Sequence, residues 1–120
     1  MTTQRRAIGA YGERLAARHL EESGLELLQR NWRCAEGEID LILRDGADVV
    51  FCEVKTRRTA TFGPPAEAVD HRKVRRLRQL AARWLTDSGV RGDRVRFDVV
   101  EVLPQPRGAA RVSHIRDAFR

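Results

Sequence analysis

The segment EIDLILRDGADVVFCEVKTR, residues 38–57, decides the fold because it contains two short apolar runs with a turn between them. The runs are residues 39–43 and 49–54, and the turn contains Asp45-Gly46. An Asp-Gly pair between runs of β-branched and aromatic residues is a strong signal for a β-hairpin. The second run is rich in Val and too short for a typical helix. Both runs are therefore predicted to be strands.

Alternation of side chains along these strands places charged groups together on one face. Glu38 and Asp40 share a face of the first strand, and Glu53 and Lys55 share a face of the second. Apolar residues lie behind them, with Val49 and Phe51 on the charged face and Ile39, Leu41, Val50, Cys52 and Val54 on the opposite faces. Charge is thus predicted at one end of an otherwise buried strand pair.

The length of the turn decides which acids are direct neighbours. If the loop is residues 45–48, Asp40 lies opposite Glu53. If the loop is only Asp45-Gly46, Glu38 faces Glu53 instead. Both registers gather three carboxylates and a lysine in one patch, although like charges placed opposite each other destabilise a sheet.

A bound divalent cation would stabilise such a patch. Mg2+ prefers oxygen ligands, commonly one or two carboxylates completed by water and a substrate phosphate. The metal lowers the pKa of a bound water and polarises phosphorus, while a nearby lysine can hold the water or the phosphate. A lone Glu-Val-Lys is more often an exposed cross-strand pair, because surface Glu and Lys are common. Two acids on one strand, E-x-K on the next and apolar residues behind both favour the metal site.

Several motifs give the chain a resemblance to a known family. They are GEIDLIL at 37–43, VFCEVKTR at 50–57, Gly12-Glu13, Asn31-Trp32-Arg33, Arg96-Phe97-Asp98-Val99 and Asp117-Ala118-Phe119. With these motifs the chain resembles the bacterial YraN-like family, which is similar to archaeal Holliday junction resolvases and to the PD-(D/E)XK restriction-endonuclease-like superfamily. The resemblance extends over most of the chain, and Ile39 stands where the superfamily usually has Pro.

The resemblance implies a metal-dependent nuclease that hydrolyses phosphodiester bonds in DNA, with branched or structured DNA among its substrates. Asp40 and Glu53 would bind Mg2+ or Mn2+, with the carbonyl of Val54 as a third ligand. Lys55 would orient or activate the attacking water and neutralise charge on phosphorus. A role in resolving junctions requires two active sites, and therefore a homodimer.

Two more acids receive supporting roles. Residues 5–22 have the apolar spacing of a helix, with Ile8, Tyr11, Leu15, Ala16, His19 and Leu20 in its predicted buried stripe. The resemblance implies that Glu13, on this helix, is an auxiliary acid of the site, whereas a solvated helix glutamate is the alternative. Glu38 would support a metal ligand or bind a second metal ion.

The positive charge of the chain indicates a polyanionic partner. Its 120 residues carry a net charge of +6, and this balance favours nucleic acid, DNA in particular. Six cations lie between residues 72 and 83 of a predicted helix, and the stretch after Lys55 is polar and basic. The predicted contacts to phosphate are Arg57, Arg58, Arg72, Lys73 and Arg76. Two alternatives are a binding protein that keeps the nuclease fold without catalysis and a protein whose basic helix binds an acidic partner protein.

The remaining elements complete a single predicted domain over residues 1–120. Helices are predicted at 5–22 and 66–87, and strands at 25–33, 39–43, 49–54, 94–103 and 110–115. The order αβββαββ predicts an α/β sandwich, a mixed sheet of about five strands flanked by two helices, in agreement with the restriction-endonuclease-like fold that the resemblance implies.

Other features of the sequence concern single residues and the compartment. Asp98 alternates with Arg96 and is predicted to be a partly buried, paired acid, and Cys52 a small buried apolar residue. No apolar run reaches the ~18 residues of a membrane span, and the N-terminal residues lack a signal-peptide core. The two cysteines lack zinc-site spacing, and a reducing cytoplasm is expected.

Overall fold

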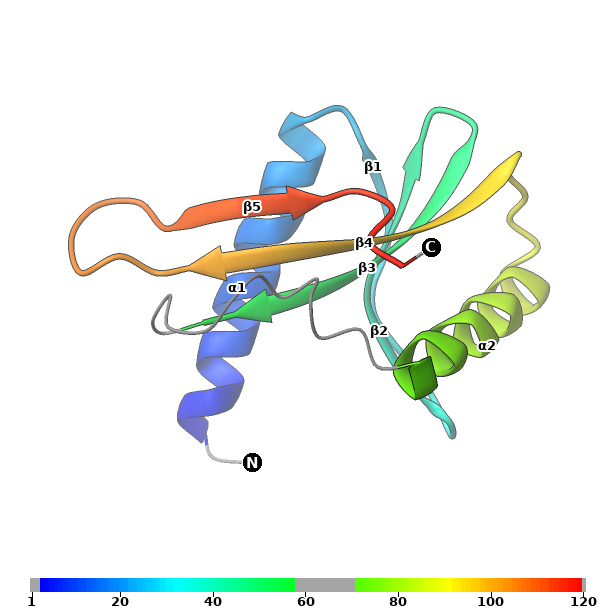
Figure 1. Cartoon of the computed structure of the whole chain (residues 1–120), viewed down its shortest axis with the longest axis horizontal. Coiled ribbons are helices and arrows are strands. Elements are labelled where there is room, and N and C mark those ends of the chain that lie inside the picture. The colour runs from blue at the N-terminus through cyan, green and yellow to red at the C-terminus, as the bar shows by residue number, and fades with distance from the viewer. Residues whose placement is uncertain (1–2, 58–70, 120) are drawn as a thin grey trace.

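Five strands form one mixed sheet with helices on both faces (Figure 1). The computed structural model describes residues 3–57 and 71–119, with side chains in the first helix described from Gly9 onward. The elements are α1 (Thr3–Glu22), β1 (Glu26–Cys34), β2 (Gly37–Asp45), β3 (Asp48–Thr56), α2 (His71–Ser88), β4 (Arg94–Leu103) and β5 (Arg111–Ile115). The predicted α/β class and the order αβββαββ are confirmed.

The strands lie in the sheet in chain order, β1-β2-β3-β4-β5. β1, β2 and β3 form an antiparallel meander, β3 and β4 are parallel, and β4 and β5 are antiparallel. Parallel neighbours require a crossover connection, and α2 lies on the connection between β3 and β4. In Figure 1, α1 lies behind the sheet and α2 lies beside the twisted end formed by β1–β3. No helix within the described ranges is long and apolar enough to span a membrane.

The hairpin register agrees with the first of the two alternatives. Arg44 pairs with Val49 and Leu41 with Cys52, which brings Asp40 beside Glu53. The loop itself is shorter than residues 45–48, because Asp45 and Asp48 already pair across the strands. Its first residue, Gly46, has φ 61°, a conformation that residues with a Cβ rarely adopt.

The face of the sheet toward α1 is covered by two alanines and a leucine of that helix. Ala16, Ala17 and Leu20 of α1 are buried against residues of the strands such as Leu41. Ala16 and Leu20 of the predicted stripe are buried, but Tyr11 is 38% exposed, so the observed buried face of α1 is rotated relative to the predicted one. The reason is close packing: a Cβ placed on Gly12 would lie 1.7 Å from Oγ1 of Thr56. A face containing Tyr would hold the helix backbone further from the sheet.

The opposite face is covered by α2. Trp84 and Leu80 of α2 pack with Phe51 and Phe97 from the strands. The ring centroids of Phe51 and Trp84 are 5.8 Å apart in an edge-to-face arrangement, and those of Phe51 and Phe97 are 5.8 Å apart in a stacked one. Of the predicted helix 66–87, residues 66–70 lie outside the described part of the chain. The buried residues of α2 are Leu80, Ala81 and Trp84.

Candidate active site

A pocket of about 600 Å3 lies between the sheet and the first half of α2. Its walls come from β2, β3, β4, α2 and the C-terminal residues. They include three of the predicted acids and three of the predicted phosphate-binding cations, namely Glu38, Asp40, Glu53, Arg72, Lys73 and Arg76. Residues assigned to metal binding and to phosphate binding therefore share one concave surface.

Asp40 interrupts the regular pairing of β2 with β3. Its Oδ2 accepts a hydrogen bond of 2.9 Å from the backbone N–H of Val54. In a continuous ladder that N–H would face the carbonyl of Ile39, but the pairing between the two strands stops at Leu41. Ile39 packs with Ile42 in the core on the α2 side. The prediction that Ile39 takes the face opposite to the charged residues is therefore wrong, because a side chain replaces the backbone partner at this position.

The carboxyl group of Asp40 is costly to ionise in this position. Burial raises the pKa of Asp40 to about 6, and the carboxylates of Glu13, Glu53 and Glu38 add to the increase. The hydrogen bond from Val54 opposes the increase without cancelling it. A cation beside Asp40 would offset both the burial and the repulsion, so the environment favours a positively charged ligand.

Glu53 holds the second carboxylate of the pocket. Its Oε1 forms an ion pair with Nζ of Lys73 on α2. Its Oε2 is buried and has no hydrogen-bond partner among the described residues. An acceptor left unpaired in a protein interior costs free energy, and a cation in the pocket would satisfy it.

Lys55 follows Glu53 by two residues on β3 and so shares its face of the sheet. It is half-buried, and within the described ranges no carboxylate lies within ion-pair distance of its ammonium group. Val54, between these two residues, is tied to Asp40 through its N–H. The predicted E-x-K motif therefore lies next to the predicted aspartate.

Glu13 and Glu38 approach this group from different elements. Glu13 projects from α1, and its pKa is raised by burial and by the charge of Glu38, although a hydrogen bond with Asn31 acts against the increase. Glu38 is exposed and pairs with Arg33 across the strands at 3.0 Å. The charges of both glutamates act on Asp40, so the structure brings the four predicted acids to one end of the sheet.

The predicted phosphate-binding cations separate into two groups. Arg72, Lys73 and Arg76 line the pocket. Arg57 instead pairs with Glu101 of β4, with 3.3 Å between Nε and Oε2, and both side chains are mostly buried. Arg58 lies outside the described residues. Arg57 thus has a partner within the sheet, and its contact with phosphate stays a prediction.

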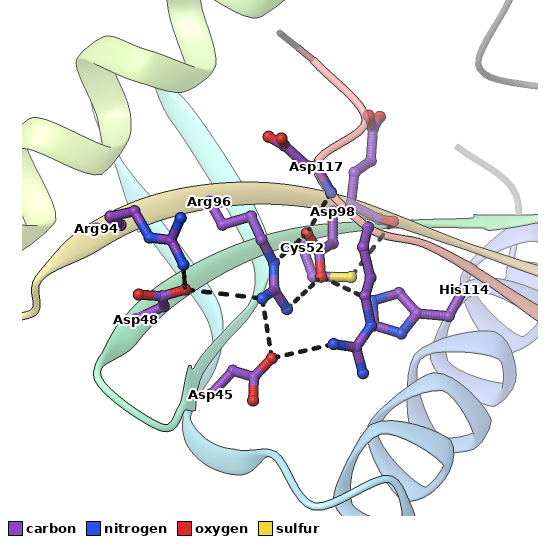
Figure 2. A network of polar contacts seen from close by, with 10 residues as sticks. Asp45, Asp48, Cys52, Arg94, Arg96, Asp98, His114 and Asp117 are labelled. Atoms are coloured by element: carbon purple, nitrogen blue, oxygen red, sulfur yellow. Dashed lines mark hydrogen bonds and ion pairs between the residues drawn. The ribbon is translucent and has the colours of Figure 1, made fainter.

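A second polar cluster lies on the α1 side of the sheet and was only partly predicted (Figure 2). The carboxylate of Asp98, 0% exposed, accepts hydrogen bonds from Arg96 at 2.9 and 3.0 Å and from the N–H of Asp117 at 2.9 Å, and lies 2.7 Å from Nε2 of His114. Burial alone would raise the pKa of Asp98, but these partners hold it below the usual value.

The prediction that Asp98 is paired is confirmed, and its burial is complete rather than partial. Arg96 also reaches Asp45 at 2.9 Å and Asp48 at 3.9 Å, so one guanidinium relieves the repulsion between the acids that close the hairpin. The contribution of His114 was missed, because only the register of β5 beside β4 brings it to Asp98.

The donors in the pocket fit a hard cation better than a soft one. They are carboxylate oxygens, one of them an orphaned acceptor on Glu53. Among the residues that the structure describes, no cluster of three or more His, Cys, Asp or Glu side chains is arranged to hold a metal ion. Asp40 and Glu53 would therefore act as a pair, completed by backbone oxygen and water.

Comparisons with known proteins identify relatives over nearly the whole chain. A family model described as "Uncharacterised protein family UPF0102" matches residues 12–102, which include Glu13, Asp40, Glu53 and Lys55. A UPF0102 protein of Frankia alni is 58% identical, with 94% of each chain covered. A UPF0102 protein of Beutenbergia cavernae is 58% identical over 92% of this chain and 93% of the relative, and one of a Nocardioides species is 54% identical over 93% and 90%. The chain belongs to the UPF0102 family, the YraN-like family that its motifs resemble.

Proposed function

We propose that the protein is a divalent-metal-dependent nuclease that hydrolyses phosphodiester bonds in DNA. One observation carries the proposal: Asp40 and Glu53 line the same pocket as Arg72, Lys73 and Arg76. Carboxylates bind hard cations, and a row of cations binds a phosphate backbone. A metal-dependent nuclease needs both kinds of group in one place.

The roles follow from the chemistry of each group. Asp40 and Glu53, with the Val54 carbonyl, would hold Mg2+ or Mn2+, which would supply an activated water and neutralise charge at phosphorus. Lys55 lies two residues from Glu53, has no carboxylate partner within the described ranges and would orient that water. Glu13 is the auxiliary acid that keeps the charge density high around Asp40.

The proposed substrate is DNA recognised by its backbone. Phosphate contacts give affinity without a choice of sequence, so specificity would come from the shape of the DNA. Branched or structured DNA is the substrate class that we propose, with Arg57 and Arg58 as additional phosphate contacts. Cleavage of a junction requires two such sites and hence a homodimer. Cys34 and Cys52 are both free thiols, which fits the reducing cytoplasm that we propose as the compartment.

One observation favours a second candidate function. The ion pair between Lys73 and Glu53 neutralises a carboxylate that a metal site needs. A protein that retains this pair permanently would bind DNA through α2 without cleaving it. This alternative predicts salt-sensitive DNA binding with no cleavage in Mg2+ or Mn2+.

A nuclease screen separates the two functions. Labelled duplex, single-stranded, flap and four-way DNA would be incubated with the protein, with and without Mg2+ or Mn2+. We expect metal-dependent cleavage by the natural protein, and loss of cleavage with retained DNA binding for Asp40→Asn. Lys55→Ala should lower the cleavage rate by roughly 100-fold or more, in the range expected for groups that assist proton transfer.

Glu26→Gln serves as a matched control, since Glu26 is an exposed acid of the same sheet, on β1, that does not line the pocket. It should cleave at close to the natural rate. Binding without cleavage of any substrate would support the accessory protein. Undiminished cleavage by Asp40→Asn would refute the assignment of the site.

A further inference from the structure

Lys73 differs from Arg76 and Arg83 of α2 in what it contacts. Its ammonium group pairs with Oε1 of Glu53 inside the pocket, where the side chain of Lys73 is 42% exposed and that of Glu53 is 18% exposed. Arg76 lines the same pocket without an ion pair to any described carboxylate. Arg83, further along α2, pairs with Glu36 on the surface instead. Lys73 is therefore an α2 cation whose position depends on a proposed metal ligand.

We propose that Lys73 and the divalent cation compete for Glu53, so that binding of the metal releases Lys73 to contact a phosphate of the nucleic acid. This inference rests on the proposed function and adds a link between its two ligands. In the absence of metal, Lys73 supplies the positive charge that the half-buried carboxylate of Glu53 requires.

The geometry allows the release. Lys has a flexible four-carbon stem, and half-exposure lets its ammonium group turn toward solvent without unfolding α2. A divalent ion at Glu53 would repel the ammonium and take over the charge balance of the carboxylate. The released Lys73 would then lie beside Arg72 and Arg76, which already line the pocket. The pocket would change from a self-neutralised surface to one that attracts phosphate.

Linkage makes the effect mutual. If the metal strengthens phosphate binding by releasing Lys73, phosphate must strengthen metal binding by the same factor. DNA and metal should therefore each increase the affinity of the other. The coupling should depend on Lys73 and should persist when Arg76 is neutralised.

Metal affinity is the first measurement. Mn2+ binding to the DNA-free protein would be followed by calorimetry for the natural protein and for Lys73→Met, Lys73→Arg and Arg76→Met. Removal of the competitor should tighten Mn2+ binding roughly three- to tenfold in Lys73→Met, in the range of a partly exposed ion pair. Lys73→Arg should retain the natural affinity. Arg76→Met removes a charge from the same pocket, and it should tighten binding by less than Lys73→Met.

DNA affinity is the second measurement, made at short incubation in a Lys55→Ala background so that cleavage of the DNA is slow. Mn2+ should strengthen DNA binding when Lys73 is present. Lys73→Met should lose most of this gain. Arg76→Met should weaken DNA binding with and without Mn2+ and keep the gain.

The outcomes separate this inference from the proposed function. If Asp40→Asn does not weaken Mn2+ binding, the proposed metal site is wrong and the inference fails with it. If Asp40→Asn abolishes Mn2+ binding but Lys73→Met leaves the Mn2+ affinity unchanged, competition is refuted and the metal site remains. Equal tightening by Lys73→Met and Arg76→Met would also refute competition, because general charge then explains both. Thermal melting confirms that each variant is folded.

Discussion

Replacement of Asp40 by Asn should stabilise the metal-free protein while it removes the proposed activity. The change keeps the shape of the side chain and removes its charge. An amide oxygen can still accept the hydrogen bond that the N–H of Val54 donates to Asp40. The burial and the neighbouring acids that raise the pKa of Asp40 then no longer act against folding.

The magnitude follows from the pKa of Asp40. The native value is about 6, against an ordinary unfolded value of about 4. This difference of about two pKa units corresponds to about 3 kcal/mol of stability, at ~1.4 kcal/mol for each unit. Between these two pH values the native state retains a proton that the unfolded state has lost, so the natural protein becomes less stable as the pH rises from about 4 to about 6. The Asn variant avoids this loss, so its advantage should be near zero below about pH 4 and complete above about pH 6.

Urea and thermal unfolding in EDTA, from pH 4 to pH 8, would measure this difference. At pH 7.5 we expect Asp40→Asn to unfold on the order of 10 °C higher than the natural protein. The control is Glu26→Gln, which removes the charge of an exposed acid on β1 and should not raise stability. Two results would refute the reasoning: no gain in stability at pH 7.5, or a gain that is as large at pH 4 as at pH 7.5. Addition of Mn2+ should stabilise the natural protein and not the Asn variant, because the proposed metal site requires the carboxylate of Asp40.

Three further predictions test the fold. Asp98→Ala leaves Arg96 and His114 without their buried anion. The free energy of unfolding, measured in urea, should fall by about 3–5 kcal/mol. A loss below about 1 kcal/mol would contradict the buried network. Gly12→Ala should destabilise the protein by about 1–3 kcal/mol, because the Cβ of the new alanine overlaps the side chain of Thr56. Thr56→Ala in the double variant should restore part of this loss. An unchanged Tm for Gly12→Ala alone would exclude the close approach of α1 to the sheet. Burial raises the pKa of the Cys52 thiol and shields it from reagents. Alkylation of the folded protein, measured by mass spectrometry, should therefore modify the half-buried Cys34 and reach Cys52 only on unfolding. Equal alkylation rates for the two thiols would contradict this packing.

The sequence was sufficient for those features that depend on local periodicity. Alternation along two strands and one Asp-Gly turn placed Asp40, Glu53 and Lys55 together, and one of the two proposed registers is the observed one. Asp98 was also correctly read as a buried, paired acid because it shares a face with Arg96. These inferences needed only the period of a strand and the chemistry of each side chain.

Features that depend on packing between distant elements could not be predicted in this way. The buried face of α1 is set by how closely a helix with Gly12 can approach Thr56, and a hydrophobicity pattern favours Tyr11 instead. Ile39 lies on the α2 side because the carboxylate of Asp40 occupies a backbone N–H. The contact between Lys73 and Glu53 joins a helix to a strand and has no signature in the spacing of residues.

The hydrogen bonds of the C-terminal residues restrict how that end of the protein can be altered. The N–H of Asp117 donates a hydrogen bond to the buried carboxylate of Asp98. The N–H of Ala118 donates to the carbonyl of Phe97 at 2.8 Å. A protein shortened before these residues would open the interior anion at Asp98 to water and remove one of its donors. Affinity tags should therefore be added after residue 119 rather than replace the residues before it, and a loss of stability after trimming should not be mistaken for loss of a binding site.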